Sequence, residues 1–285
     1  MYQYMVTGSF KQSMNASLHS AGRKLLNPIE YTLEVFLMIY LSFRAAIFDQ
    51  AQGLRSVFSV VSAQIYFTGF QALPLISVLA LASGTIVILQ SSTNLTLLGG
   101  GSILGDLIVA IIVRELAPLL TALIVIARSG TAVASEIGNM RVNREIEALE
   151  AMGIHPLSYV VFPRLVGGIV SVICLSVYFV VVACMGGYMV TSMLHDLPFS
   201  FYADSLARAF SSADAGLFFL KNTFSGAIIF MISCYQGFLV QNSPHEVPQV
   251  TTKAVVNSII YVVIFNMTVT ILFYLSRLMA LGMIV

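Results

Sequence analysis

Long apolar runs separated by short polar segments dominate the chain after its first 66 residues. Five of these runs are long enough to cross the roughly 30 Å of hydrocarbon in a bilayer. The predicted spans are residues 67–90, 103–127, 165–191, 218–240 and 254–281. They lack the period-2 alternation of membrane β-barrels, so we expect an all-α integral membrane protein with five transmembrane helices.

A shorter apolar segment, residues 27–44, precedes the first predicted span and carries charges near its ends. Pro28 suits the first turn of a helix. Four apolar residues recur at helical spacing: Leu33, Phe36, Leu37 and Tyr40. We predict a helix that lies in the membrane interface. The alternative is a sixth span, which would invert the distribution of loop charges.

Lys and Arg are unevenly distributed over the segments between the predicted spans. If the N-terminus is cytoplasmic, the opposite side holds only Arg208 and Lys221. The cytoplasmic side then holds ten: Lys11, Arg23, Lys24, Arg44, Arg55, Arg128, Arg141, Arg144, Arg164 and Lys253. Since cytoplasmic loops carry the excess of basic residues, we predict a cytoplasmic N-terminus and, after five crossings, a C-terminus outside. The chain divides into a cytoplasmic segment, 1–66, with the interfacial helix, and a five-helix domain, 67–285.

Composition supports a membrane protein. Hydrophobic residues make up 58% of the 285 and charged residues only 9%, whereas a soluble domain carries about 25% charge. So few polar residues could not coat a soluble fold of this size. The net charge of +1 argues against a nucleic-acid partner, which calls for a basic stripe.

The segment RVNREIEALEAMGIHP, residues 141–156, predicts a short helix over 143–152 between the second and third spans. Asn143 is the expected N-cap, and Glu145 would lie in the first turn, where the helix dipole favours an anion. Gly153 fits the C′ position, and Pro156 follows it. One apolar stripe is predicted: Ile146, Leu149 and Met152.

Such a helix is either a loop resting on the membrane or a docking surface for a partner. The acidic cluster Glu145, Glu147 and Glu150 favours docking, because anionic lipids repel it and a basic groove on a protein attracts it.

No motif in the chain predicts energising chemistry of its own. It has no G-x-x-x-x-G-K-[ST] loop for ATP phosphates, and its four histidines are scattered without metal-ligand spacing. We predict no catalytic residue, no metal site and no cofactor in this chain. A separate subunit would supply the energy.

Arg114 and Glu115 fall near the middle of the second predicted span, where a charge is costly and commonly functional. Adjacent residues on a helix point in different directions, so the two need different partners. Pro118 removes the helical hydrogen bond to the Arg114 carbonyl and predicts a kink. Two interpretations of Arg114 remain open: pairing with a carboxylate on a neighbouring helix, or binding an anionic group such as a lipid phosphate.

Small residues mark both ends of the third predicted span. They are Gly167, Gly168 and Ser171 at its start and Gly186 and Gly187 at its end. Small side chains permit close approach of helices in a membrane.

The run RELAPLLTALIVIARSGTAVASEIGNMRVNREIEALEAMGIHPLSYVVFPR, residues 114–164, strongly resembles the MlaE/YrbE family of bacterial ABC-transporter permeases. The resemblance covers roughly residues 65–276 and includes CYQG at 234–237 and TTKAVV at 251–256. Residues 242–249 depart from the Gly-rich loop common in that family.

The resemblance implies a homodimer in the bacterial inner membrane that joins two ABC ATPase subunits, which bind ATP and Mg²⁺. It also implies a periplasmic MCE-domain protein, as a hexameric ring, in some systems a STAS-domain protein, and transport of phospholipids or related lipids that maintains outer-membrane asymmetry. The helix at 143–152 would be the coupling helix, with Arg141, Glu145, Glu147, Leu149, Glu150 and Met152 at the ATPase. A lipid site at the dimer centre would include Val87, Asn94, Leu95, Leu98, Arg114 and Glu115. Asn94 is polar where the family pattern favours an apolar residue.

The sequence leaves three other functions to consider. An ABC permease for a small polar solute is the main alternative, because EALEAMG at 147–153 is similar to the cytoplasmic loop of importers. That function requires a hydrophilic pathway, whereas only the second span offers charge within the membrane. An ion-coupled carrier predicts paired buried carboxylates and inverted repeats, and neither is found. The third is a scaffold without transport activity.

Overall fold

The computed structural model describes residues 31–35, 37–38, 40–42, 44, 54–98, 103–194, 198–241 and 243–280. Over these residues the chain is helical, without a strand. The longer helices are α2 (Leu54–Thr68), α3 (Leu73–Leu98), α8 (Phe162–Leu194), α10 (Ser212–Phe238) and α11 (Glu246–Ala280). The second span is built from α4 (Ile103–Ile108), η2 (Val109–Leu116), α5 (Ala117–Val125), η3 (Ile126–Gly130) and α6 (Thr131–Val142). Shorter helices are η1 (Phe70–Ala72), α7 (Glu145–Ala151), η4 (Leu157–Val161) and α9 (Phe199–Ala209).

The predicted count of five spans is confirmed among the described residues. The helical stretches long and apolar enough to cross a membrane are Phe58–Ser91, Gly105–Val142, Leu157–Val190, Ser212–Phe238 and Glu246–Met279. The predicted bounds were too short at several ends, because helices continue beyond their apolar stretches where they pack on neighbours. The boundary predicted at residue 66 lies within α2.

The largest extension is in the second span, which was predicted to end at residue 127. Its helix continues through α6, so Arg128 and Arg141 lie on a helix and not in a loop. Although α6 is less apolar than the rest of the span, it packs against α10 and α11. Tertiary contacts therefore maintain a helix that hydropathy alone does not predict.

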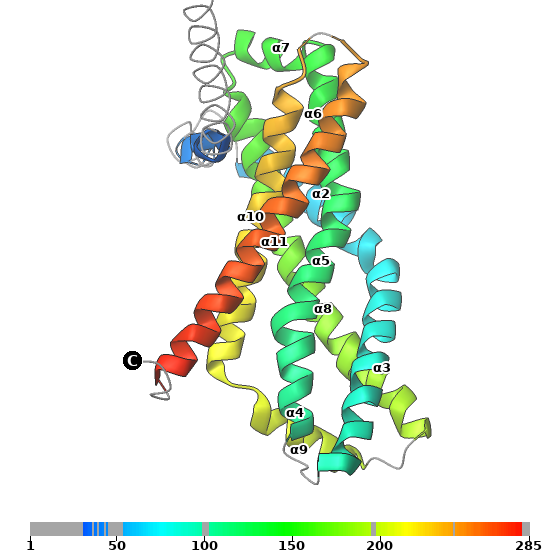
Figure 1. Ribbon diagram of the computed structural model, residues 1–285. Coiled ribbons are helices and arrows are strands. Elements are labelled where there is room, and N and C mark those ends of the chain that lie inside the picture. Colours follow the sequence, from blue (N-terminus) through cyan, green and yellow to red (C-terminus); the bar gives the residue numbers. More distant parts are fainter. Residues whose placement is uncertain are drawn as a thin grey trace, which may run out of the picture.

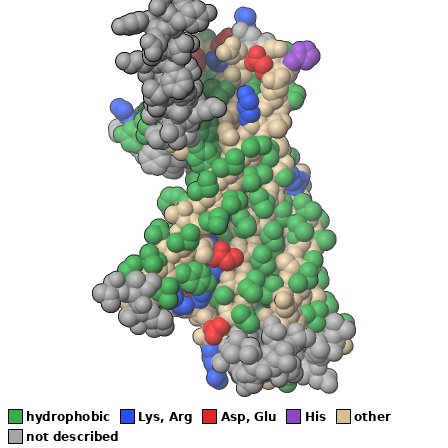
Figure 2. Space-filling model, in the orientation of Figure 1, with side chains coloured by type: hydrophobic (Ala, Val, Ile, Leu, Met, Phe, Trp, Pro, Cys, Tyr) green, Lys and Arg blue, Asp and Glu red, His purple; other side chains and the backbone are tan. Residues whose placement is uncertain are grey.

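Two ends of the bundle are distinct (Figure 1). One end carries α7, the end of α10 and the start of α11, and the other carries α9, the end of α3, the start of α4 and the C-terminal end of α11. Hydrophobic side chains cover most of the visible face between these ends (Figure 2). The span in α11 thus runs from the end that carries α7 towards the opposite end.

The interior is formed where α8 and α10 pack together, with α5 beside them. Of the five spans, the one in α10 is the most enclosed and the one in α11 the least. At the crossing of α3 and α8, a Cβ on Gly84 would lie 2.2 Å from the Ala183 carbonyl oxygen. A Cβ on Gly187 would lie 2.6 Å from the backbone of Gly84. The predicted close approach at Gly187 is therefore confirmed, and its partner is α3.

The second span departs twice from α-helical geometry. The π-helical segments η2 and η3 contain Arg114 and Arg128, respectively. Pro118 follows η2 directly, in the first turn of α5, so the predicted disturbance at this proline takes the form of a π-helical segment. Such segments are frequent at functional sites.

The N-terminal segment is described in part. A shorter apolar helix, Tyr31–Ser42, contains the predicted stripe, of which Leu33, Leu37 and Tyr40 are each more than half exposed; Phe36 is outside the described residues. Tyr31 accepts a hydrogen bond from Gln236, and Glu34 accepts one from Tyr235. These contacts attach the segment to α10 near the end that carries α7.

Candidate functional site

Arg114 pairs with a carboxylate on another span. Its Nε lies 2.9 Å from Oδ1 of Asp214, and the side chains are 9% and 0% exposed. The other oxygen of Asp214 accepts the Ser211 backbone N–H at 3.0 Å, which completes a capping box at the start of α10. One buried carboxylate therefore serves both a helix cap and an arginine.

Glu115 pairs with a different residue, Lys221 of α10, at 3.0 Å. The Lys221 side chain is completely buried, whereas that of Glu115 is 40% exposed. The Nζ of Lys221 also donates to the Arg114 carbonyl oxygen at 2.8 Å and to Thr270 Oγ1 at 2.7 Å. Three groups thus accept from the ammonium, which has three hydrogens. The prediction that Arg114 and Glu115 need separate partners is confirmed.

Uncharged polar contacts continue from these ion pairs along α10. Asn222 accepts a hydrogen bond from Ser176 of α8, and Ser225 accepts one from Asn266 of α11 at 3.0 Å. In a membrane, such contacts between helices contribute about 1 kcal/mol each. Together with the ion pairs, they connect the second span, α8 and α11 through one face of α10.

Two arginines contact the same aromatic ring on α11. The Cζ of Arg114 lies 5.5 Å from the ring centroid of Phe273, and the Cζ of Arg277 lies 5.4 Å from it. Both distances are within the range of cation–π attraction. Arg277 is exposed, so a basic side chain accessible from outside the bundle lies next to the buried pair.

The other residues predicted to line a lipid site come from α3. Val87 is partly buried and packs on the hydrophobic core. The side chains of Asn94, Leu95 and Leu98, in the last turns of α3, lie outside the part of the chain that the structure describes. The lipid-binding role of this set stays a prediction.

The short helix predicted between the second and third spans is α7. Gly153 has φ +75°, its N–H donates to Glu150 and the next N–H, of Ile154, donates to Leu149. This is a Schellman motif, as Gly at C′ predicts. The predicted N-cap was wrong: Arg144 takes that position with φ 58°, without a capping side chain. Asn143 instead ends α6 and donates to Glu145 at 3.3 Å.

The predicted apolar stripe of α7 is divided between the protein and its surface. Ile146 is 2% exposed and Leu149 packs on the core, whereas Met152 is 66% exposed. Arg141, in the last turn of α6, is half-buried. The acidic residues Glu145, Glu147 and Glu150 are all exposed. The helix is thus anchored by its first apolar residues and presents its carboxylates outward.

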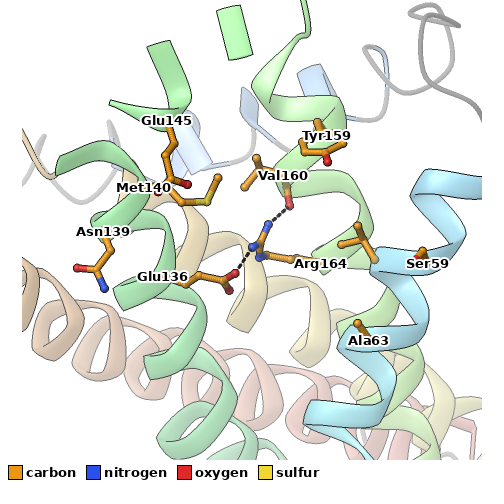
Figure 3. Close-up of a pocket in the computed structure, with 10 residues that line it drawn as sticks. Ser59, Ala63, Glu136, Asn139, Met140, Glu145, Tyr159, Val160 and Arg164 are labelled. Atoms are coloured by element: carbon orange, nitrogen blue, oxygen red, sulfur yellow. Dashed lines mark hydrogen bonds and ion pairs between the residues drawn. The ribbon is translucent and has the colours of Figure 1, made fainter. Parts of the chain in front are cut away.

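A cavity of about 500 Å³ lies next to α7, between α2, α6 and the start of α8 (Figure 3). Arg164 Nη2 pairs with Glu136 Oε1 at 2.7 Å, and Arg164 Nη1 donates to the Val160 carbonyl at 2.9 Å. Glu145 of α7 also lines the cavity. The Arg164–Glu136 pair joins α6 to α8 beside the exposed helix.

Sequence reasoning missed Asp214 and misplaced Lys221. Lys221 was counted among the segments outside the membrane, but it is buried within α10 and pairs with Glu115. Charge within the spans is therefore not confined to the second span. The available signal was the spacing of polar residues on α10, since Asp214, Lys221 and Ser225 recur at i, i+7 and i+11, on one helical face.

The comparisons with known proteins agree with the observed architecture. The sequence model of the permease MlaE family matches residues 61–272, which is most of the chain. The chain belongs to the MlaE permease family. The Rickettsia relatives, at 33–35% identity, bear the name of probable ABC transporter permease proteins. This MlaE-family chain is a multi-pass permease subunit of that transporter class.

Similar proteins occur in bacteria and in a plant, as three relatives illustrate. A probable ABC transporter permease protein of Rickettsia bellii is 35% identical over 217 residues, which cover 76% of this chain and 84% of the relative. The intermembrane phospholipid transport system permease protein MlaE of Haemophilus influenzae is 28% identical over 72% of this chain and 79% of its own length. The chloroplastic protein TRIGALACTOSYLDIACYLGLYCEROL 1 of Arabidopsis thaliana is 28% identical over 74% of this chain and 60% of its own length.

Proposed function

We propose that this MlaE-family permease moves phospholipids or related lipids between the inner membrane and the periplasm or outer membrane. In this proposal it contributes to the lipid asymmetry of the outer membrane. The observation that carries the proposal is membership of a family in which the Haemophilus relative bears the name of a phospholipid transport permease.

The charged residues within the bundle support a lipid substrate. Arg114 and Arg277 flank Phe273, and Arg277 is exposed. We propose that a lipid phosphate binds this pair of guanidinium groups, with acyl chains against Val87, Leu95 and Leu98. Arginine suits this role because its planar group binds phosphate oxygens through several N–H donors.

The exposed face of α7 supports coupling to an ATPase. We propose that two ATPase subunits bind ATP and Mg²⁺ and that each seats one α7 helix. The ATPase would contact Glu145, Glu147, Glu150 and Met152. On the side of α7 that faces the bundle, Arg141 and Leu149 would support the helix. Ile146 is 2% exposed, so a force applied to α7 is transmitted to the core rather than absorbed by a loose loop.

The exposure of α11 supports a homodimer. It is the least enclosed of the five spans, and a second copy would cover part of its apolar face. We further propose the remaining predicted partners and the predicted orientation. These are a periplasmic MCE-domain hexamer, a STAS-domain protein, and an inner-membrane location with a cytoplasmic N-terminus and α7 and a periplasmic C-terminus.

Reconstitution tests the function directly. The permease and its ATPase would be placed in liposomes with a fluorescent phospholipid, and movement to acceptor vesicles would be followed with and without ATP. We expect ATP-dependent transfer that a catalytically inactive ATPase abolishes. Transfer of a small polar solute in place of the phospholipid would contradict the proposal.

A further inference from the structure

A second cavity lies far from α7, between η2, α8 and α9, and has a volume of about 540 Å³. Two turns of η2 contribute Val109 and Val113, which are 0% and 5% exposed. No charged side chain lines it among the described residues. Its size lies within the range of ligand pockets, roughly 300–1,000 Å³.

The hollow is produced by the residue pattern of α9. Phe199, Ala203 and Ala207 lie along one side of this helix and Phe210 follows its last residue. All four line the cavity, with the two small residues between the two rings. The helix is held in place from its other side, because a Cβ on Gly105 of α4 would lie 2.0 Å from the Ser205 carbonyl oxygen. α9 is therefore packed as closely on α4 as backbone atoms allow, and moving it into the hollow would break this contact.

The opposite wall belongs to α8 and is also apolar. Val180, Cys184 and Tyr188 lie at i, i+4 and i+8, so this wall runs about 12 Å along the span. Half of a bilayer core is about 15 Å thick, the depth that one leaflet's chains fill. The wall thus has nearly the length of one lipid chain.

Polar groups near the cavity are already engaged. The Tyr202 hydroxyl donates to the Cys184 carbonyl oxygen at 3.0 Å, and the Tyr202 ring stacks on Tyr188 at 4.8 Å. A buried water needs two to four polar partners, and apolar cavities stay dry and accept apolar ligands. Water is therefore a poor occupant of this space.

The cavity also opens where hydrocarbon is available. Met185, Phe199 and Phe210 line it and are 67%, 63% and 49% exposed, and Met185 lies within the third span. We propose that this cavity binds one hydrocarbon chain of a membrane lipid. The head group stays outside it, so the site selects for an acyl chain and not for a particular head group.

This site does not depend on the proposed transport function, because a lipid that stays bound as a structural component would occupy it in the same way. It is also separate from the predicted lipid site at Arg114. Val113 faces the cavity, whereas the next residue, Arg114, pairs with Asp214 of α10. Filling the cavity would therefore contact the segment that carries the buried charges from its apolar side.

Photo-crosslinking tests the proposal. The protein would be reconstituted in nanodiscs that contain a phosphatidylethanolamine or a phosphatidylglycerol with a diazirine in a 16-carbon chain, and labelled peptides would be mapped. We expect labelling on the peptides of α9 and of residues 180–188, equal for both head groups. Ala207→Phe fills the hollow and should lower this labelling at least fivefold, and Ala203→Leu should lower it less.

Ala213→Phe is the matched control, because Ala213 is exposed and outside the cavity; it should leave labelling unchanged. Labelling that excess unlabelled lipid displaces indicates an exchanging lipid, and labelling that resists displacement indicates a resident one; both support the site.

Equal labelling of wild type and Ala207→Phe would overturn the proposed site. So would a disulfide between copies in Ala207→Cys together with absence of lipid labelling on wild-type α9, because a second chain would then cover the cavity. If the wild-type protein shows normal labelling but no lipid transfer in the liposome assay, the transport function alone is refuted and the site stands.

Discussion

Lys221 of α10 donates from Nζ to the backbone carbonyl of Arg114 at 2.8 Å. That carbonyl is the acceptor that Pro118, four residues later, cannot reach because proline has no N–H. A side chain from another span thus takes over a bond that the helix lacks. The same ammonium neutralises Glu115, so one buried lysine stabilises both the backbone and the charge of the second span.

Lys221→Met should destabilise the permease. It leaves Glu115 without its cation and the Arg114 carbonyl without this donor, which we expect to cost about 2 kcal/mol, less than for a fully buried pair because Glu115 is partly exposed. The chain has no Trp, so unfolding is best followed with a thiol-reactive dye that reports the buried Cys184 and Cys234. Adding Glu115→Gln should recover part of the loss; equal stability of Lys221→Met and wild type would contradict this role.

The Arg114–Asp214 pair separates the two interpretations of Arg114. Arg114→Gln alone leaves a buried carboxylate unpaired and should reduce stability by about 3 kcal/mol. Arg114→Gln with Asp214→Asn removes both charges and should restore most of that stability. If Arg114 also binds the lipid phosphate, lipid transfer stays low in the double variant despite its restored stability. Recovery of transfer together with stability would assign Arg114 a purely structural role.

The carboxylates of α7 should contribute to ATPase binding. Glu147→Gln with Glu150→Gln removes two exposed charges and should weaken association with the ATPase about tenfold at low salt, with a smaller effect at high salt because exposed charges are screened. Asp204→Asn, an exposed acid on α9, is the control and should have no effect. Binding measured by surface plasmon resonance checks this, and a salt-independent loss would argue against an electrostatic role.

Gly153 should set the end of α7 through its backbone conformation. Gly153 has φ +75°, and no atom lies within 4 Å of the position that a Cβ would take. Gly153→Ala therefore introduces only backbone strain, which costs about 1 kcal/mol. Gly153→Asn should be better tolerated, since Asn adopts this conformation more readily. ATPase activity stimulated by the permease should fall more for Ala than for Asn, and the reverse order would contradict the strain argument.

The crossing of α3 and α8 should not accept a methyl group. Gly84→Ala would place a Cβ 2.2 Å from the Ala183 carbonyl oxygen, so the helices must separate and the melting temperature should fall by several degrees. Gly216→Ala provides a control within α10, because nothing lies within 4 Å of its built Cβ. Similar melting temperatures for the two variants would show that the crossing is adaptable.

The sequence predicted the features that depend on local composition. Hydropathy indicates five spans, and Gly153 with Pro156 indicates where α7 ends. Prediction from the sequence failed where tertiary contacts override local signals. For example, α6 stays helical because it packs on α10 and α11. Arg144 starts α7 in a left-handed conformation that no residue preference predicts.

The partners of the ion pairs could not be predicted from the sequence for the same reason. Helical geometry indicates that Arg114 and Glu115 face different partners, but those partners lie 100 and 106 positions away. Their identity depends on how α10 packs against the second span, and the periodicity of the sequence does not predict that packing. The polar spacing on α10 identifies the face, and only the packing identifies the contacts.

The double use of Asp214 has a consequence for how Arg114 can respond to an anion. Asp214 sits in the first turn of α10, where the positive end of the helix dipole and the Ser211 N–H stabilise a carboxylate without any arginine. If a ligand drew Arg114 away, Asp214 would keep both of these contacts. Asp214 would thus retain part of its stabilisation, so release of the buried guanidinium towards an anion costs less than release from a carboxylate in the middle of a helix.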